Sequence, residues 1–335
     1  MHWLMFVLSA TVIVVAGTKL SQYGDLIAEH SGLGRLWIGV VLLAGATSLP
    51  ESFTAVSAVL IDAPNIAVGD LFGAGLTNML TLALIDLAYR EKRVWQQAAL
   101  EQALIATLAI ILTGLAGLLI IVRQPIPIEG IGLGTIAIAA IYVFGMRVVF
   151  RQEDMRRREK ERERIVEAEA PRGAASANAL RRASIGFAVA ALALLAAAPL
   201  LAEAAKEIAV TTGISATFIG TSLVAITTSL PELVTSFAAV RLGALDLAVG
   251  NLFGSNAINM AVLLLADAAY RQGPLLASIE TTHVATALLS ILLMSVGLMG
   301  IIYRAEKRFL LIEPDSVLMI VGYLSGMWLL FRIGG

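Results

Sequence analysis

Long apolar runs separated by short polar breaks dominate the chain. A membrane-spanning helix needs about 20 mostly apolar residues, and ten stretches meet that requirement. They cover residues 3–21, 36–61, 66–88, 98–122, 129–149, 184–203, 214–240, 247–269, 281–303 and 315–333. The pattern predicts an all-α polytopic membrane protein with ten transmembrane helices. Because the second and seventh stretches are longer than a bilayer requires, we expect those two helices to be tilted or discontinuous.

The composition strengthens this prediction. Of the 335 residues, 58% are hydrophobic and 15% are charged, whereas a soluble domain typically has about 25% charged residues. The chain has no cysteine, which excludes disulfides, thiolate nucleophiles and cysteine-based metal sites. The formal net charge of −1 gives no indication of a nucleic-acid partner. We expect the lipid bilayer to surround the chain, and we expect no cofactor and no obligate protein partner.

The positive charges are distributed unequally between the two sides of the predicted bundle. When the breaks are placed on alternate sides, all Lys and Arg residues fall on one side except Arg123, Lys206, Arg271 and Arg332. The positive-inside rule then predicts that both termini lie outside and that the break after the fifth stretch is cytoplasmic. The first stretch has no Lys or Arg before it, so we interpret it as a span rather than a secretory signal.

The break after the fifth stretch is the only sizeable hydrophilic segment of the sequence. It divides the chain into a first half at residues 1–149, a cytoplasmic linker at residues 150–183 and a second half at residues 184–335. Basic and acidic residues are mixed at helical spacing in the linker, which indicates a solvated linker helix. Attraction to anionic lipid headgroups is the alternative, and the interleaved Glu residues weaken it.

The two halves contain the same sequence pattern, offset by 181 residues. GATSLPES at residues 45–52 corresponds to ITTSLPEL at residues 226–233, and AVGDLFGAGLTNM at residues 67–79 corresponds to AVGNLFGSNAINM at residues 248–260. Because each half has an odd number of spans, the second half must enter the membrane in the opposite orientation. The sequence therefore predicts two inverted five-helix repeats, an architecture typical of secondary transporters.

Each repeat carries one Glu and one Asn at the same separation. Glu51 precedes Asn78 by 27 residues, and Glu232 precedes Asn259 by 27 residues. A polar turn lies midway between them, so at a rise of 1.5 Å per residue both side chains lie roughly 20 Å from the turn, near the bilayer midplane. Two Glu and two Asn side chains are thus expected at one centre. A buried carboxylate at this depth is costly, and two in equivalent surroundings indicate a functional site rather than a helix-bridging hydrogen bond.

Oxygen-bearing residues and prolines surround each Glu. Hydroxyl side chains on the same helix face as the Glu residues are Thr47, Ser48, Thr228 and Ser229. Pro50 and Pro231 lack the backbone donor, so we expect helix breaks there and free carbonyls in the preceding turn. Such carbonyls are tolerated in a membrane only where they line a cavity or bind a ligand.

This set of oxygens suits a hard cation. Ca²⁺ takes six to eight oxygen ligands, and two carboxylates neutralise one Ca²⁺, while the same oxygens also suit two or three Na⁺. An empty site would hold two negative charges in low dielectric, so only loaded sites should be occluded. We therefore expect antiport, with Na⁺ or H⁺ as the ion exchanged for Ca²⁺. A channel is disfavoured by the broken helices, and an enzyme by the scattered positions of His2, His30 and His283.

At these motifs the sequence resembles the calcium/cation antiporter superfamily, and it is most similar to the compact sodium/calcium exchangers of prokaryotes. The resemblance implies a multi-pass protein of the plasma membrane, the inner membrane in prokaryotes, that exchanges Ca²⁺ for Na⁺ by alternating access. It implies a calcium site at Glu51, Glu232, Thr47, Thr228, Asn78 and Asn259. It implies sodium sites at Ala44, Ser48, Glu51, Ala225, Ser229, Glu232 and Ser255.

The sequence departs from the family pattern at a few positions. Ala74 stands where the second repeat has Ser255, so one hydroxyl for Na⁺ is missing from the first repeat. Both Asn positions carry Asn, whereas many relatives have one Asp there, which makes K⁺ coupling less suitable and leaves Na⁺ and H⁺ open. Asp70 replaces the Asn at position 251, and its spacing places it about 12 Å nearer the outer surface than Asn78. It is expected either to recruit cations at the outer mouth or to lie at a solvated helix end.

Two further acids are repeated near the opposite ends of their helices. Asp86 in the first repeat corresponds to Asp267 in the second. We interpret both as packing or interface residues.

Overall fold

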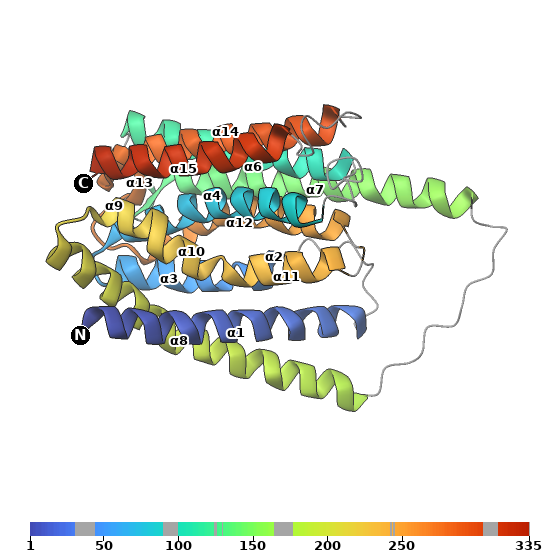
Figure 1. Ribbon diagram of the computed structural model, residues 1–335, viewed down its shortest axis with the longest axis horizontal. Helices are drawn as coiled ribbons and strands as arrows, with labels where there is room; N and C mark the ends of the chain where they lie inside the picture. Colours follow the sequence, from blue (N-terminus) through green and yellow to red (C-terminus); the bar gives the residue numbers. More distant parts are fainter. Residues whose placement is uncertain are drawn as a thin grey trace.

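The computed structural model describes residues 1–30, 44–89, 100–123, 126–128, 130–163, 177–241, 243, 245–303 and 314–334. Figure 1 shows the long helices side by side in one bundle, with the N- and C-termini at the same end. We call this end the terminal end. The opposite end, beyond which α7 (Leu133–Glu163) extends, is called the linker end.

The first half of the chain comprises α1 (His2–His30), α2 (Ala44–Thr47), α3 (Leu49–Leu60), α4 (Pro64–Ala88), α6 (Leu100–Val122), β1 (Pro127–Ile128), β2 (Ile131–Gly132) and α7. The second half comprises α8 (Ala177–Thr212), α9 (Ala216–Ile219), the π-helix η3 (Gly220–Val224), α10 (Ala225–Thr228), α11 (Leu230–Arg241), α12 (Leu245–Ala269), α13 (Leu275–Ser278), α14 (Thr282–Tyr303) and α15 (Pro314–Gly334). The short strands β1 and β2 pair antiparallel before α7. Apart from this pair of two-residue strands, the regular structure of the described residues is helical, as the sequence predicts.

Within the described residues, eight helices are long and apolar enough to cross a membrane. A ninth span is formed if Ala216–Thr228 and Leu230–Arg241, which meet at a bend of 42°, are taken together. Of the stretch predicted at residues 36–61, residues 44–61 are described and include α2 and α3, while residues 36–43 lie outside the described part. In the predicted linker, α7 continues to Glu163 and α8 begins at Ala177, and residues 164–176 lie outside the description.

Two helices, α4 and α12, form the interior of the bundle. In each of them 78% of the most apolar window is buried, against 22% in α7 and 28% in α15. Large apolar side chains pack completely inside, including Phe72 on α4 and Phe253 on α12. The polar side chains on α4 and α12 are therefore held within protein rather than exposed to lipid.

The second and seventh stretches are discontinuous, as predicted. The helix breaks at Ser48, between α2 and α3, and at Ser229, between α10 and α11. Both breaks lie two residues before a proline, Pro50 or Pro231, whose missing N–H interrupts the helical ladder. The π-helix η3 just before the second break was not anticipated, because no residue pattern distinguishes it from an ordinary helix.

Glycines allow α4 to lie directly against η3. A Cβ added at Gly69 would come within 3.0 Å of the Thr221 backbone nitrogen, and one at Gly220 within 2.6 Å of the Ile66 carbonyl oxygen. Backbone-to-backbone packing of this kind is typical of membrane helices that meet at small residues. It brings the polar face of α4 next to the broken helix of the second half.

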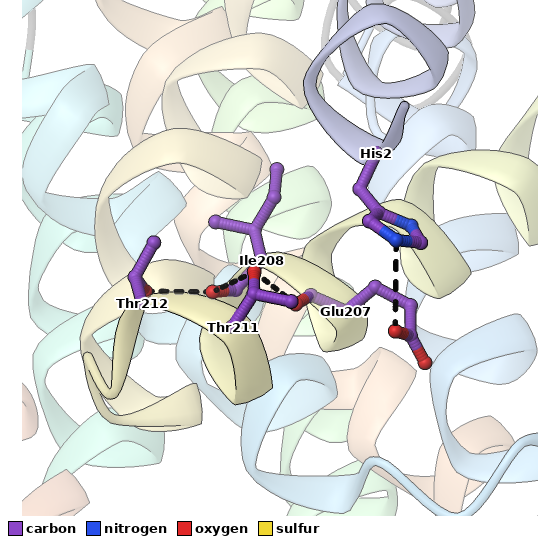
Figure 2. Close-up of polar contacts among 5 residues, drawn as sticks. All are labelled: His2, Glu207, Ile208, Thr211 and Thr212. Carbon is purple, nitrogen blue, oxygen red and sulfur yellow. Dashed lines mark hydrogen bonds and ion pairs between the residues drawn. The ribbon is translucent and has the colours of Figure 1, made fainter.

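At the edge of the bundle, α1 packs along α8 (Figure 1). Figure 2 shows His2 at the start of α1 facing Glu207 on α8, with His2 Nε2 3.9 Å from Glu207 Oε2. Nearby on α8, the hydroxyls of Thr211 and Thr212 donate hydrogen bonds to carbonyls of the preceding turn. Because His2 and Glu207 are partly exposed, this pair contributes little to stability.

The repeated acids near the ends of α4 and α12 join neighbouring elements. Asp86 accepts a hydrogen bond of 2.6 Å from the hydroxyl of Ser316 on α15. Asp267 accepts hydrogen bonds from the backbone N–H of Gly132 and of Leu275, at 2.9 and 2.7 Å, and from the hydroxyl of Thr135. These contacts agree with the interpretation of Asp86 and Asp267 as packing residues.

Candidate central cation site

The two predicted Glu residues lie at the centre of the bundle, immediately after the two helix breaks. Glu51 and Glu232 are fully buried, in the first turns of α3 and α11. The hydroxyl of Ser229 donates a 3.1 Å hydrogen bond to Glu51 Oε1, and the hydroxyl of Ser48 donates a 3.4 Å hydrogen bond to Glu232 Oε1. At the repeat offset of 181 residues, Ser48 corresponds to Ser229 and Glu51 corresponds to Glu232. The same contact is therefore made twice, each time between the two halves.

Four oxygens at this centre are buried and have no hydrogen-bond partner among the described residues. They are Glu51 Oε2, Glu232 Oε2, Asn78 Oδ1 and Asn259 Oδ1. Buried polar atoms are almost always paired, and a buried carboxylate oxygen is costly to leave unpaired. Four such oxygens on the two Glu and two Asn residues provide what a hard cation requires. The residues present therefore fit a bound cation.

Further hydroxyls surround Glu232. The Ser255 hydroxyl lies 3.4 Å from Glu232 Oε1, and the Thr47 hydroxyl lies 3.4 Å from the Ser255 hydroxyl. Position 74, which corresponds to Ser255, is a buried alanine, so Glu51 has no equivalent hydroxyl. The two halves of the site are consequently unequal.

The carbonyls of Ala44 and Ala225 are hydrogen-bonded, whereas we expected the prolines to leave them free. The Ala44 carbonyl accepts a hydrogen bond from the Ser48 backbone N–H at 3.0 Å, and the Ala225 carbonyl accepts one from the Ser229 N–H at 3.1 Å. The hydroxyl three residues after each alanine, that of Thr47 or Thr228, also donates a hydrogen bond to the same carbonyl, at 3.2 or 3.3 Å. A cation role for these two carbonyls stays a prediction.

The prediction of a solvated helix end for Asp70 is wrong. Asp70 is fully buried on α4, and its Oδ1 accepts a 2.8 Å hydrogen bond from the hydroxyl of Thr228. Spacing along α4 gives a height for Asp70 but no information about the neighbouring helix. The break in the second half places Thr228 at that height, so Asp70 belongs to the lining of the site.

Asn256 was also missed. Its Oδ1 accepts a 2.8 Å hydrogen bond from Asn78 Nδ2, and its own Nδ2 lies 3.5 Å from the carbonyl of Gly75, which is its counterpart in the first half. This contact orients the Asn78 carboxamide so that Oδ1 remains free. The GSN segment at residues 254–256 could have suggested the residue, because it repeats the small-residue segment beside Asn78 with an added carboxamide.

At the terminal end, a separate polar cluster joins α4 to α14. Asn65 Nδ2 donates a 3.1 Å hydrogen bond to Glu280 Oε1, and His283 Nε2 lies 3.2 Å from Asn65 Oδ1. The Thr217 hydroxyl donates a 3.0 Å hydrogen bond to Glu280 Oε2. His283 is fully buried in this cluster and does not lie with the paired Glu residues.

Comparison with known proteins assigns the family. The model of the family described as "Sodium/calcium exchanger protein" matches residues 1–148 and 183–332. The chain belongs to this family. As a sodium/calcium exchanger family member it is a multi-pass membrane protein of a cation antiporter family, and it is a transporter rather than an enzyme. The two matched segments correspond to the two halves on either side of the linker.

Individual relatives of this family member agree with that assignment. "Inner membrane protein YrbG" of Escherichia coli K12 is 26% identical over 260 residues, which are 78% of this chain and 77% of that protein. The structure of the "H+/Ca2+ Exchanger CAX" matches with a TM-score of 0.72 and 13% identity over 99% of this chain and 85% of that chain. The structure of the sodium-calcium exchanger NCX_Mj matches with a TM-score of 0.60 and 19% identity over 98% of each chain. The two structures support the fold.

Proposed function

We propose that this protein exchanges Ca²⁺ for Na⁺ across the membrane by alternating access at the central site. The observation that carries the proposal is the pair of buried Glu residues. Each of them is held through one oxygen by a serine of the opposite half and has its other oxygen free. Two carboxylates neutralise one Ca²⁺, and the free Asn78 and Asn259 oxygens add neutral ligands of the type that Ca²⁺ accepts.

Alternating access rests on an arrangement of two inverted five-helix repeats with ten spans. The equivalent contacts Ser229–Glu51 and Ser48–Glu232 support a pseudo-two-fold axis through the site. The position of both termini at one end of the bundle is what an even number of spans requires (Figure 1). With the distribution of Lys and Arg, this gives both termini outside and the linker in the cytoplasm. Similarity to the inner membrane protein YrbG favours an inner membrane.

Na⁺ is the proposed coupling ion because hydroxyls lie beside the carboxylates. Ser48, Ser229, Ser255 and Thr47 are oxygen ligands suited to a monovalent cation, and Ser255 and Ser48 both contact Glu232. H⁺ is the alternative, since a carboxylate also takes a proton. The similarity in fold to structures named for sodium-calcium and for H⁺/Ca²⁺ exchange does not distinguish the two ions.

Obligatory exchange follows from the charge of the empty site. Removing the cation leaves two carboxylates facing each other in a low dielectric, at a cost of several kcal/mol. The protein therefore closes around a loaded site more readily than around an empty one. Ca²⁺ leaving on one side must be replaced by another cation before the site can return.

The test is ⁴⁵Ca²⁺ uptake by the purified full-length protein in liposomes. We expect uptake when the vesicles contain Na⁺ and the outer solution does not, and we expect uptake to stop when a Na⁺ ionophore removes the gradient. Protein-free liposomes measure leakage. Uptake driven by an imposed pH gradient and indifferent to Na⁺ would contradict Na⁺ coupling, and uptake that persists with neither gradient would contradict exchange.

A further inference from the structure

The two halves of the site differ most at one pair of equivalent positions, Asp70 and Asn251. In the second half, Asn251 is satisfied on both sides of its carboxamide. Its Nδ2 donates to the hydroxyl of Ser236 at 3.1 Å and lies 3.4 Å from the hydroxyl of Thr235, and its Oδ1 lies 3.4 Å from the hydroxyl of Thr47. All of these residues are buried, so the polar groups around Asn251 are satisfied by hydrogen bonds between neutral side chains.

In the first half, Asp70 makes only half of the equivalent contacts. Its Oδ1 accepts from Thr228, which matches the contact of Asn251 with Thr47. Its Oδ2 occupies the position of the Asn251 NH₂ group but cannot donate. This oxygen is buried and has no hydrogen-bond partner among the described residues.

The residues that should satisfy this second oxygen are changed as well. Ser236 corresponds to Ala55, which has no hydroxyl. Thr235 corresponds to Thr54, but only the Thr235 hydroxyl has hydrogen-bond partners among the described residues. The Thr235 hydroxyl donates to the Pro231 carbonyl of its own helix at 2.8 Å, whereas the Thr54 hydroxyl is buried without a partner in the described residues. Because Thr235 lies 3.4 Å from Asn251, the equivalence of the two halves places the free hydroxyl of Thr54 near the free oxygen of Asp70.

The number of buried carboxylates also indicates a cation near Asp70. Glu51, Glu232 and Asp70 are all fully buried, and Glu51 and Asp70 are bound by the adjacent residues Ser229 and Thr228. One Ca²⁺ balances two carboxylates, which leaves the third negative charge unbalanced in a low-dielectric interior. A buried charge of this kind requires a partner. Of the described Lys and Arg residues, none is paired with Asp70. A small cation bound between its free oxygen and neighbouring oxygens would balance this charge.

We infer that Asp70 and Thr54 form a subsite for one Na⁺ ion on the terminal-end side of the central site, with no counterpart in the second half. The inference rests on the proposed exchange function and deepens it. Carboxylate and hydroxyl oxygens are ligands for a hard monovalent ion, and a single carboxylate balances its charge. The subsite replaces the hydroxyl that the first half lacks at Ala74.

The test compares ²²Na⁺ binding to wild-type protein and to Asp70→Asn, measured at equilibrium without Ca²⁺. Asp70→Asn keeps the shape of the side chain and restores the residue that the second half carries. We expect this variant to bind one Na⁺ fewer per chain. We expect Thr54→Val, which retains the carboxylate, to raise the half-saturating Na⁺ concentration several-fold. Thr235→Val is the matched control in the second half and should bind Na⁺ as wild type does.

Elution of each variant as wild type on size exclusion shows that it is folded. Equal ²²Na⁺ binding by wild type, Asp70→Asn and Thr54→Val would overturn the subsite. So would a shift of the pH dependence of ⁴⁵Ca²⁺ flux in Asp70→Asn with unchanged ²²Na⁺ binding, because Asp70 would then hold a proton. Failure of the proposed function is distinct, since it appears as wild-type protein without Na⁺-driven ⁴⁵Ca²⁺ flux whatever the result of the binding experiment.

Discussion

The close approach of α4 to the broken helix can be tested by adding one methyl group at Gly73. A Cβ at this position would meet the Thr221 carbonyl oxygen and would lie 2.7 Å from both the Thr221 Cα and the Ala225 Cβ. Two of these three atoms belong to the backbone and cannot rotate away. Gly73→Ala must therefore push α4 from η3 and α10.

The magnitude follows from two opposing effects. Overpacking a well-packed interior costs about 1–3 kcal/mol, while replacing Gly by Ala within a helix gains up to about 1 kcal/mol. Gly114→Ala on α6 is the matched control, because its new Cβ would meet only the Ile291 Cδ1, at 3.7 Å. The gain in helix propensity is common to both variants. The difference between Gly73→Ala and Gly114→Ala should therefore be about 1–3 kcal/mol, with Gly73→Ala less stable.

The assay is thermal unfolding of the two purified variants in one detergent, followed by the loss of the monodisperse peak on size exclusion. We expect the midpoint of Gly73→Ala to be several degrees below that of Gly114→Ala. Transport by Gly73→Ala should also fall, because displacement of α4 separates Asp70 from Thr228. A Gly73→Ala variant as stable and as active as Gly114→Ala would refute the close packing.

Three other predictions follow from single contacts. Ser48→Ala and Ser229→Ala should each raise the half-saturating Ca²⁺ concentration of ⁴⁵Ca²⁺ flux by roughly 3- to 30-fold, because each removes a hydroxyl bound to a carboxylate of the opposite half. The effect of Ser229→Ala should be the larger, because Ser255 still contacts Glu232 when Ser48 is replaced; wild-type half-saturation in either variant would contradict the role of that contact. Asn256→Ala should lower flux with little change in thermal stability, because Asn78 loses the group that orients its free oxygen; wild-type flux would contradict that role. Asp267→Ala should lower the unfolding midpoint strongly, since it leaves two backbone N–H groups unpaired at about 1–3 kcal/mol each, while the remaining folded protein keeps wild-type Ca²⁺ affinity; a changed affinity in stable protein would contradict a packing role.

The features that could be predicted from the sequence are those set by residue spacing along a single helix. Eight or nine of the span positions, the breaks before Pro50 and Pro231 and the burial of both Glu51 and Glu232 follow from residue spacing, and the described residues agree with them. The contacts of Asp70 could not be predicted in this way. Spacing gives the height of Asp70 on α4, but Thr228 reaches it only because a bent helix of the other half passes at that height.

The same limit explains Asn256 and η3. Asn256 acts on Asn78 across the centre of the molecule, through a contact between residues 178 positions apart. The π-helix at Gly220–Val224 packs tightly against α4, and its apolar and hydroxyl residues are compatible with an ordinary helix.

The account depends on a divalent ion shared by Glu51 and Glu232. The most direct measurement is ⁴⁵Ca²⁺ flux in liposomes by Glu51→Gln and by Glu232→Gln, each isosteric with wild type and each checked for folded protein in the membrane. Each variant removes one of the two charges and one free carboxylate oxygen. The account predicts that either substitution abolishes Ca²⁺ transport while the protein remains folded. Near-normal flux in both variants would contradict it.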